Sequence, residues 1–185
     1  MIKRLATITA ALLLGSTSVE AAPRTGTFED HVILWNAIAA TGTQLRLNTN
    51  DCFRGQQPDG YYAYDNKGNS EFVVCQDNAK GPSQVDWTEN DYDTLRHEAV
   101  HLIQDCRDGR RADGRLSPIG SDDEILRLVD ATIGREYARQ ITESYRANGM
   151  TDPSDLLTEV EAFAIAASAN AANIAELVKQ ECATY

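Results

Sequence analysis

The hydrophobic positions of this chain recur at helical spacing at both ends of its folded part and at strand-like spacing between them. Residues Thr27 to Ala40 place apolar side chains near every third or fourth position, as an amphipathic helix does. Three short stretches with the composition of half-buried strands follow: Gln44–Asn48, Tyr61–Asp65 and Glu71–Gln76. Residues 66–69, Asn-Lys-Gly-Asn, suit a hairpin turn between the last two.

The second half of the chain has the signals of helices. Thr88 and Ser121 each precede an acidic residue by three positions, which is the pattern of a capping box at the start of a helix. These helices are expected to reach about Arg107 and Ala147, and Gly134 is a candidate break in the second. Pro153 suits the first turn of a last helix. A small antiparallel sheet followed by helices is an α+β fold and excludes an alternating β/α one.

The beginning of the chain has the pattern of a secretory signal. Two basic residues precede the apolar stretch Leu5–Leu14, and small side chains lie just before a cleavage point after Ala21. The apolar stretch is too short to span a bilayer, so no stable membrane insertion is expected. We therefore predict a signal peptide over residues 1–21 and a single domain over 22–185, located in the periplasm or outside the cell.

The acidic composition excludes one class of partner. Cleavage would remove two of the 17 basic and one of the 28 acidic residues, which leaves a net charge of −12. Such a chain repels phosphate backbones, so nucleic acid is not an expected partner. The charge identifies neither a substrate nor an oligomeric state.

The four cysteines predict two disulfides. An even number of cysteines in an exported chain is typical of a disulfide framework, and the C-x-x-C spacing of a zinc ribbon is absent. If the strands form a meander, the first and third end on the same side, which favours Cys52 with Cys75 and leaves Cys106 with Cys182. The second bridge requires the last helix to bend or break near residues 168–173.

The helix that follows Thr88 contains the sequence His97-Glu98-Ala99-Val100-His101, an H-E-x-x-H motif. Side chains four residues apart lie on nearly the same face of a helix. His97 and His101 can therefore direct two imidazole nitrogens to one metal ion, for which zinc is the expected choice. Glu98 is close enough to reach a water molecule beside that ion.

A catalytic zinc ion needs a third protein ligand. The longer motif with a further glycine and histidine is absent, because Gln104 and Arg107 occupy those positions, and His31 is more typical of a structural residue. Glu161 lies among apolar helical neighbours, where a carboxylate is costly unless a cation pairs with it. We therefore predict Glu161 as the ligand. Glu159, on a more mixed face, is the competing candidate, and its alternative role is a solvated helix charge.

The motif followed by a glutamate before a small residue on a later helix resembles the gluzincin branch of the zincin metallopeptidases. The resemblance implies a zincin-like catalytic domain that hydrolyses a peptide or protein substrate with a zinc-activated water molecule. In it, His97, His101 and Glu161 hold zinc and Glu98 is the general base.

The resemblance also implies that a strand before the motif pairs with extended substrate, a role that falls on Glu71–Cys75. A second donor to the developing oxyanion is usual, and Tyr137, Tyr145 and His31 are all open as candidates. Two alternatives differ in class from a peptidase. One is a metal-free, disulfide-stabilised binding or inhibitory module, and the other is a zinc hydrolase of a non-peptide amide.

Overall fold

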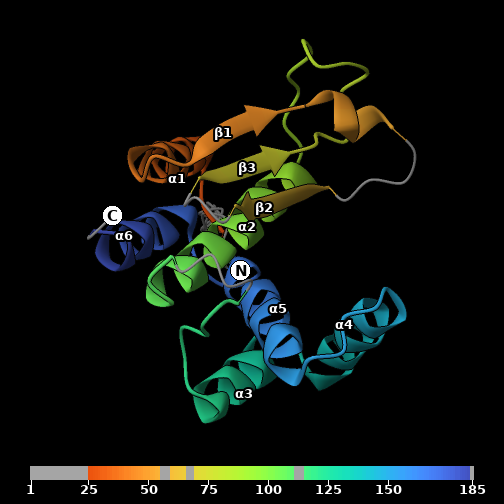
Figure 1. The fold of residues 1–185 in the computed structure, drawn as a ribbon, viewed down its shortest axis with the longest axis vertical. Coiled ribbons are helices and arrows are strands. Elements are labelled where there is room, and N and C mark those ends of the chain that lie inside the picture. Colours follow the sequence, from red (N-terminus) through yellow and green to blue (C-terminus); the bar gives the residue numbers. More distant parts are fainter. Residues whose placement is uncertain (1–24, 55–58, 66–68, 111–114, 184–185) are drawn as a thin grey trace, which may run out of the picture.

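The computed structural model describes residues 25–54, 59–65, 69–110 and 115–183. Along the sequence, the three strands follow the first α-helix and precede the other α-helices (Figure 1). These residues form an α+β fold, as predicted, with one three-stranded sheet and six α-helices. The elements are α1 (Phe28–Ala40), β1 (Gln44–Leu47), the 3₁₀ turn η1 (Asn50–Phe53), β2 (Gly60–Tyr64), β3 (Ser70–Val74), α2 (Glu89–Arg107), α3 (Asp122–Ala131), α4 (Arg135–Ala147), α5 (Pro153–Ala166) and α6 (Ala171–Glu181).

The sheet is mixed, which corrects the prediction of an antiparallel one. β3 lies in the centre, pairs antiparallel with β2 and runs parallel to β1, so that Phe72 lies between Tyr62 and Leu45. The meander order is therefore wrong. A short turn forces β2 to pair with β3, but the long connection over residues 48–59 lets β1 pass to the other edge of β3. Residues 66–68 of the expected turn lie outside the described part.

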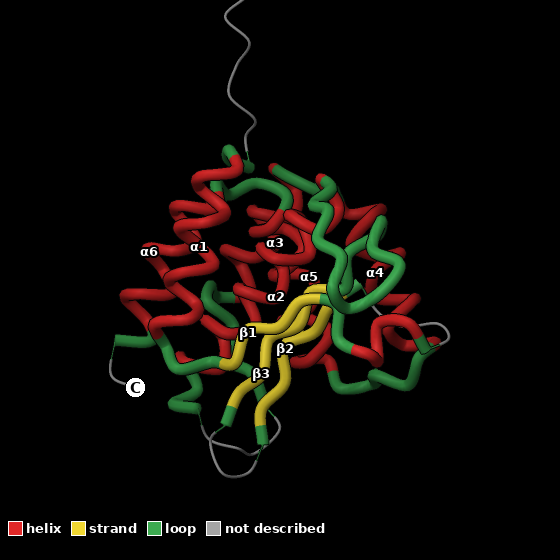
Figure 2. The backbone as a smooth tube through the Cα atoms, turned by 90° about the horizontal axis from the view of Figure 1, so that it is seen from above, coloured by secondary structure: helices red, strands yellow, loops and turns green. Residues whose placement is uncertain are grey.

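α2 is the central helix of the molecule. One side of it packs on the sheet and on α1 and α6, where Phe72, Leu95 and Leu102 are fully buried in the main hydrophobic core. Figure 2 shows the three strands side by side along one face of the molecule, with helices behind them. Thr88 caps α2 together with Asp91, as the sequence predicted.

The helices α3 and α4 form a smaller group that packs against α5 (Figure 1). Ser121 and Glu124 form the predicted capping box at the start of α3. A second hydrophobic cluster, centred on Ile125, Val129 and Ala164, fills the space between these helices. α5 is consequently covered on more than one side, by α2 as well as by α3 and α4.

Both predicted disulfides are present. Cys52 is bonded to Cys75, at the end of β3, and Cys106, near the end of α2, is bonded to Cys182. The parallel arrangement of β1 and β3 brings the first pair together, although the meander from which we predicted it does not exist. The helical break that the second pair required is also present, because α5 ends at Ala166 and Asn170 caps the start of α6.

The predicted signal peptide, residues 1–21, lies outside the described residues. Within the part that the structure describes, no helix combines the length and the apolar composition needed to cross a bilayer.

A buried histidine–arginine pair holds α1 against the side of α2 that faces away from His97. The His31 Nδ1 atom lies 2.7 Å from the carbonyl oxygen of Thr27, and its Nε2 atom lies 2.7 Å from a guanidinium nitrogen of Arg96. Arg96 also donates to the carbonyl of Ala166 at 2.9 Å and to Asp93 at 3.0 Å. Because arginine only donates, His31 accepts at Nε2 and is neutral with its proton on Nδ1.

This pair predicts a pH dependence of the free energy of unfolding. Burial lowers the pKa of His31 from 6.5, so below that pH the unfolded chain takes up a proton that the folded chain does not. The wild-type protein should therefore lose more stability than His31→Gln between pH 6.5 and 5.5, by up to about 1.4 kcal/mol per pH unit. Urea denaturation of both proteins across this range checks it. Equal slopes would contradict the assigned protonation state.

Candidate metal centre

The two histidines of the motif face α5 from one side of α2. His97 and His101 are four residues apart in the helix, and their Nε2 atoms lie 3.1 Å from each other. Their rings meet edge to face with centroids 4.7 Å apart, and both side chains are buried. The helical spacing therefore produces the convergence of two imidazole nitrogens that the sequence predicted.

The carboxylate that meets these histidines belongs to Glu159 of α5. Its Oε2 atom lies 3.5 Å from Nε2 of His97 and 3.4 Å from Nε2 of His101. Ligand atoms of the three side chains all lie within 4.8 Å of one another, and the Glu159 oxygen is buried. Two adjacent helices thus bring a His-His-Glu cluster to one point.

The position of Glu161 corrects our choice of third ligand. Its carboxylate is buried and points elsewhere: it accepts hydrogen bonds from the Gln104 amide at 2.9 Å and from the backbone N–H groups of Ile119 and Gly120 at 2.9 and 2.7 Å. Of the apolar neighbours that favoured Glu161, Leu157, Val160 and Ala164 pack with α3 and α4, whereas Ile165 packs against the main core. The periodicity therefore located an apolar face of α5, but most of that face belongs to the smaller helical group.

The separations within the cluster are compatible with ligands of one metal ion. Tetrahedral ligands with bonds of about 2.0–2.1 Å lie roughly 3.3 Å from one another. The observed separations of 3.1, 3.4 and 3.5 Å agree with this value. Two imidazole nitrogens and one carboxylate oxygen are also ligands that zinc accepts. The residues that the structure brings together therefore fit a metal ion with three protein ligands, and zinc is one of the ions that they suit.

The electrostatics of the cluster favour a positive charge among these side chains. Burial alone would lower the pKa of His101, but the Glu159 carboxylate and the nearby Glu98 outweigh it and raise this pKa to about 9. Burial opposes ionisation of Glu159, yet its contacts with His101 and His97 lower the pKa of its carboxyl group. Without metal, an imidazolium–carboxylate pair supplies the opposite charges that burial requires. A divalent cation could supply them instead.

Glu98 is held at the edge of the sheet. Its Oε2 atom accepts a hydrogen bond from the backbone N–H of Tyr62 at 2.8 Å, and the Tyr62 hydroxyl binds Asp105, further along α2, at 2.5 Å. Tyr62 thus fixes β2 against the motif helix at two points. The strand predicted to pair with substrate, Glu71–Cys75, is the central strand β3, so its pairing edges are occupied and β2 is the edge beside the site.

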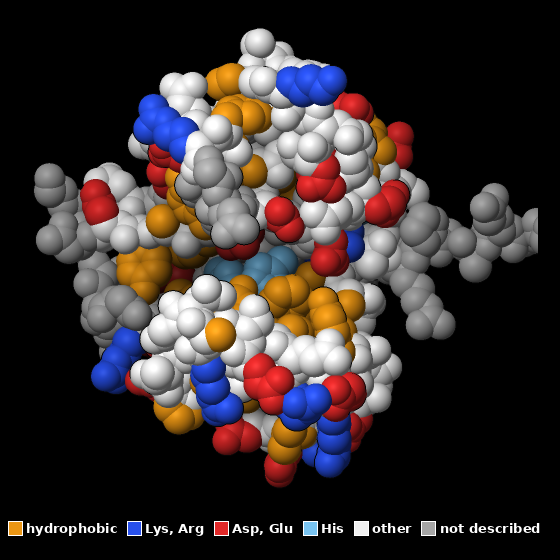
Figure 3. All heavy atoms as spheres, turned by 90° about the vertical axis from the view of Figure 1, so that its right-hand side faces the viewer, with side chains coloured by type: hydrophobic (Ala, Val, Ile, Leu, Met, Phe, Trp, Pro, Cys, Tyr) orange, Lys and Arg blue, Asp and Glu red, His pale blue; other side chains and the backbone are white. Residues whose placement is uncertain are grey.

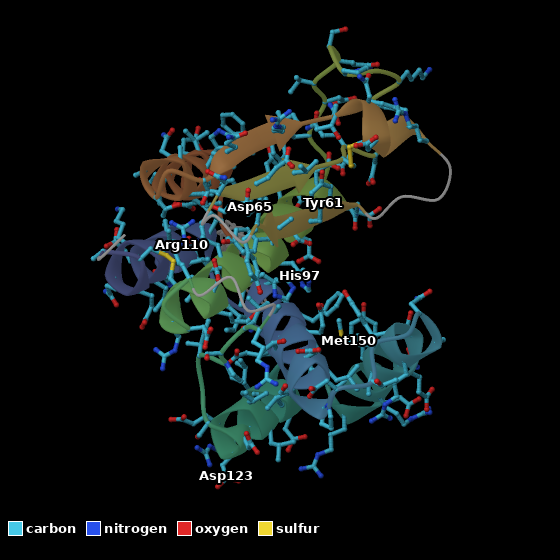
Figure 4. All side chains as sticks on the ribbon, viewed as in Figure 1. Tyr61, Asp65, His97, Arg110, Asp123 and Met150 are labelled. Carbon is cyan, nitrogen blue, oxygen red and sulfur yellow. A yellow bond between two sulfur atoms is a disulfide. The ribbon has the colours of Figure 1, made fainter. Side chains whose placement is uncertain are left out.

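A cleft of about 370 Å³ opens beside the motif. Its lining residues come from the β2 side, from α2 and from α4 and α5; they are Asp59, Gly60, Asn90, Asp93, Thr94, His97, Glu98, Tyr137, Tyr145 and Phe163. Figure 3 shows histidine side chains at the bottom of a groove between two parts of the surface. In Figure 4, His97 of α2 lies between the sheet and the smaller helical group.

Two of the three candidates for an oxyanion donor line this cleft, and His31 does not. Tyr137 is about half exposed, and Tyr145 lies close enough to Glu159 to sense its charge. Burial, together with the charge of Glu159, raises the pKa of Tyr145, so its phenol keeps its proton at neutral pH. It therefore remains a hydrogen-bond donor at the edge of the cluster.

Sequence reasoning ranked Glu159 behind Glu161 and missed the role of Gln104. Gln104 is fully buried, and its Oε1 atom lies 2.8 Å from Nδ1 of His101. The available signal was its position three residues after His101, on the same face of a helix. For Glu159 the signal was Phe163, four residues later, whose ring packs 4.4 Å from that of His97.

Comparison with known proteins identifies a family but no activity. A family model described as a domain of unknown function (DUF8637) matches residues 27–183. No curated protein and no solved structure matches the chain.

The close approach of β2 to α2 depends on Gly60. A Cβ atom at this position would lie 2.5 Å from Cγ2 of Thr94 and 2.7 Å from the carbonyl oxygen of Val73. Gly60→Ala should therefore lower the free energy of unfolding by about 1–3 kcal/mol, the usual cost of overpacking. Gly81→Ala is the matched control, because nothing lies within 4 Å of the added atom there. Denaturant titrations of both variants check this, and equal stabilities would contradict the packing described.

Proposed function

This chain belongs to the DUF8637 family of domains of unknown function, and we propose that it is a zinc-dependent hydrolase that cleaves peptide bonds. The observation that carries the proposal is the His97, His101 and Glu159 cluster at zinc-like separations, with Glu98 of the same motif beside it. The resemblance to gluzincin metallopeptidases supports it. A glutamate on a later helix would be the third ligand, although it is Glu159 and not Glu161.

The side chains around the cluster divide the chemistry among them. When bound, zinc supplies a Lewis acid that polarises a carbonyl group and lowers the pKa of water. Glu98 would accept a proton from the attacking water and return it to the leaving amine. The N–H of Tyr62 holds one Glu98 oxygen at 2.8 Å and so fixes the direction of the carboxylate. Tyr145 would donate a hydrogen bond to the developing oxyanion.

The position of the cleft supports an extended peptide as the substrate. It runs from Gly60, at the edge of the sheet, to the aromatic side chains Tyr137 and Phe163. An extended peptide could lie along β2, the strand whose edge borders the site. The two disulfides support a location in an oxidising compartment, the periplasm or the outside of the cell. We therefore propose an exported peptidase with peptide or protein substrates.

Glu98→Gln tests the assigned base. This variant keeps the shape of the side chain but cannot accept a proton, so turnover should fall by at least about 10²-fold while roughly one zinc per chain is retained. A library of synthetic peptides, read by mass spectrometry, measures cleavage, and elemental analysis measures zinc. Glu89→Gln makes the same change at an exposed position of α2 and should behave as wild type.

Three outcomes would count against the proposal. Persistent cleavage by Glu98→Gln would exclude the role of Glu98. Cleavage of small amides but of no library peptide would favour the non-peptide hydrolase. A purified wild-type protein that takes up no zinc would favour the metal-free binding or inhibitory module.

Glu159→Gln tests the third ligand. An amide is a far weaker zinc ligand than a carboxylate, so the affinity for zinc should fall by more than roughly tenfold. Competition with a chromophoric chelator measures it. Glu176→Gln, which makes the same change on α6 at an exposed glutamate, is the control. Unchanged affinity in Glu159→Gln would remove this residue from the site.

A further inference from the structure

Gln104 connects the metal cluster to a second buried carboxylate. Its Oε1 atom lies 2.8 Å from Nδ1 of His101, and its Nε2 atom lies 3.0 Å from the carbonyl oxygen of Thr158 and 2.9 Å from Oε2 of Glu161. Gln104 and Glu161 are both buried almost completely. These contacts form a chain of hydrogen bonds that runs from Glu161 of α5 to Gln104 of α2 and on to His101, a proposed zinc ligand.

The donors around Glu161 determine which group donates and which accepts in each of these hydrogen bonds. The backbone N–H groups of Ile119 and Gly120 contact its two oxygens at 2.9 and 2.7 Å, and these groups only donate. The carboxylate of Glu161 must therefore accept. The carbonyl of Thr158 is also an acceptor only.

The orientation of the Gln104 amide follows from these two acceptors. Its NH₂ group must face Glu161 and Thr158, since an oxygen there would meet two other oxygens. Its Oε1 atom must then face His101, which has to place its proton on Nδ1. When a metal ion takes the place of a proton on Nε2, the imidazole is neutral and its lone pair lies on Nε2, the atom that is 3.4 Å from Glu159.

His97 has no comparable arrangement. Within the described part of the chain, its buried Nδ1 atom has no hydrogen-bond partner, and its ring is held by packing against Phe163 with centroids 4.4 Å apart. Control of imidazole orientation by hydrogen bonding is therefore concentrated on His101. A residue that orients a ligand in this way contributes to metal affinity without touching the metal.

We propose that Glu161 is a positioning residue of the metal centre, which acts through Gln104 to hold His101 with its Nε2 lone pair toward the ion. The proposal rests on the proposed function, because it assumes that the cluster binds zinc. It gives Glu161 a role in the site other than the ligation expected from the sequence. Since Ile119 and Gly120 precede α3, it also joins that helix to the metal cluster.

Glu161→Gln tests the proposal with almost no change in shape. A glutamine has only one acceptor oxygen, so its NH₂ group must replace one of the two carboxylate oxygens. In one orientation this NH₂ group faces the N–H of Gly120. In the other it faces the N–H of Ile119 and the amide of Gln104, which would then have to turn over. We expect the affinity for zinc to fall by about 10–100-fold, the usual effect of removing a partner that orients a ligand. Asp91→Asn is the matched control: it makes the same carboxylate-to-amide change at a buried residue of α2 whose oxygens accept from the backbone N–H groups of Asp77 and Thr88.

Metal affinity separates positioning from a merely structural role. Zinc and cobalt affinities should be measured by chelator competition at a temperature where the metal-free variants are folded, as judged by circular dichroism. A structural role would lower the unfolding midpoint and leave these affinities unchanged. Weaker binding by Glu161→Gln, with Asp91→Asn within about threefold of wild type, is the expected result. Equal affinity in wild type and Glu161→Gln would overturn the proposal and leave the zinc site intact.

A measurement on the wild-type protein requires no variant. In the zinc-loaded protein, long-range ¹H–¹⁵N correlation spectra should show His101 with its proton on Nδ1 and its Nε2 atom bound to zinc. A proton on Nε2 of His101 would overturn the assigned chain of hydrogen bonds from Glu161 through Gln104. A wild-type protein that binds no zinc would instead contradict the proposed function, so the two failures can be told apart.

Discussion

The burial of ionisable side chains where α2 meets α5 is the constraint on which the rest of the structure depends. Each such group would cost several kcal/mol if it were left without a partner of opposite charge or a hydrogen bond. His101 and Glu159 offset this cost by pairing, and Glu161 does so through three N–H donors. These contacts tie the two helices together in the relative position that creates the candidate metal centre.

The remaining elements hold α2 and α5 in that position. On the far side of α2, Arg96 binds His31 of α1 and the carbonyl of Ala166 at the end of α5. The bond between Cys106 and Cys182 fixes the last turn of α2 to the end of α6. Because the sheet packs on α2 as well, the motif is supported on several sides while its histidine face stays open to the cleft.

Local signals made much of this arrangement predictable. A capping box at Thr88 and the four-residue spacing of His97 and His101 determine a helix and its reactive face with no knowledge of the fold. The third ligand could not be found in this way. An apolar stripe identifies a buried face but not the element that covers it, and α5 has several neighbours. Glu161 therefore had the expected apolar surroundings, while Glu159 had the histidines. The strand order was equally beyond local signals, because a long connection leaves both edges of β3 open.

Anomalous diffraction from crystals of the protein grown with zinc tests the central claim most directly. Data collected on both sides of the zinc absorption edge would locate the ion without any assumption about its ligands. The account predicts one peak bounded by Nε2 of His97, Nε2 of His101 and a carboxylate oxygen of Glu159, with Glu161 still bound to Gln104. Zinc bound elsewhere, or no peak between the two histidines, would contradict it.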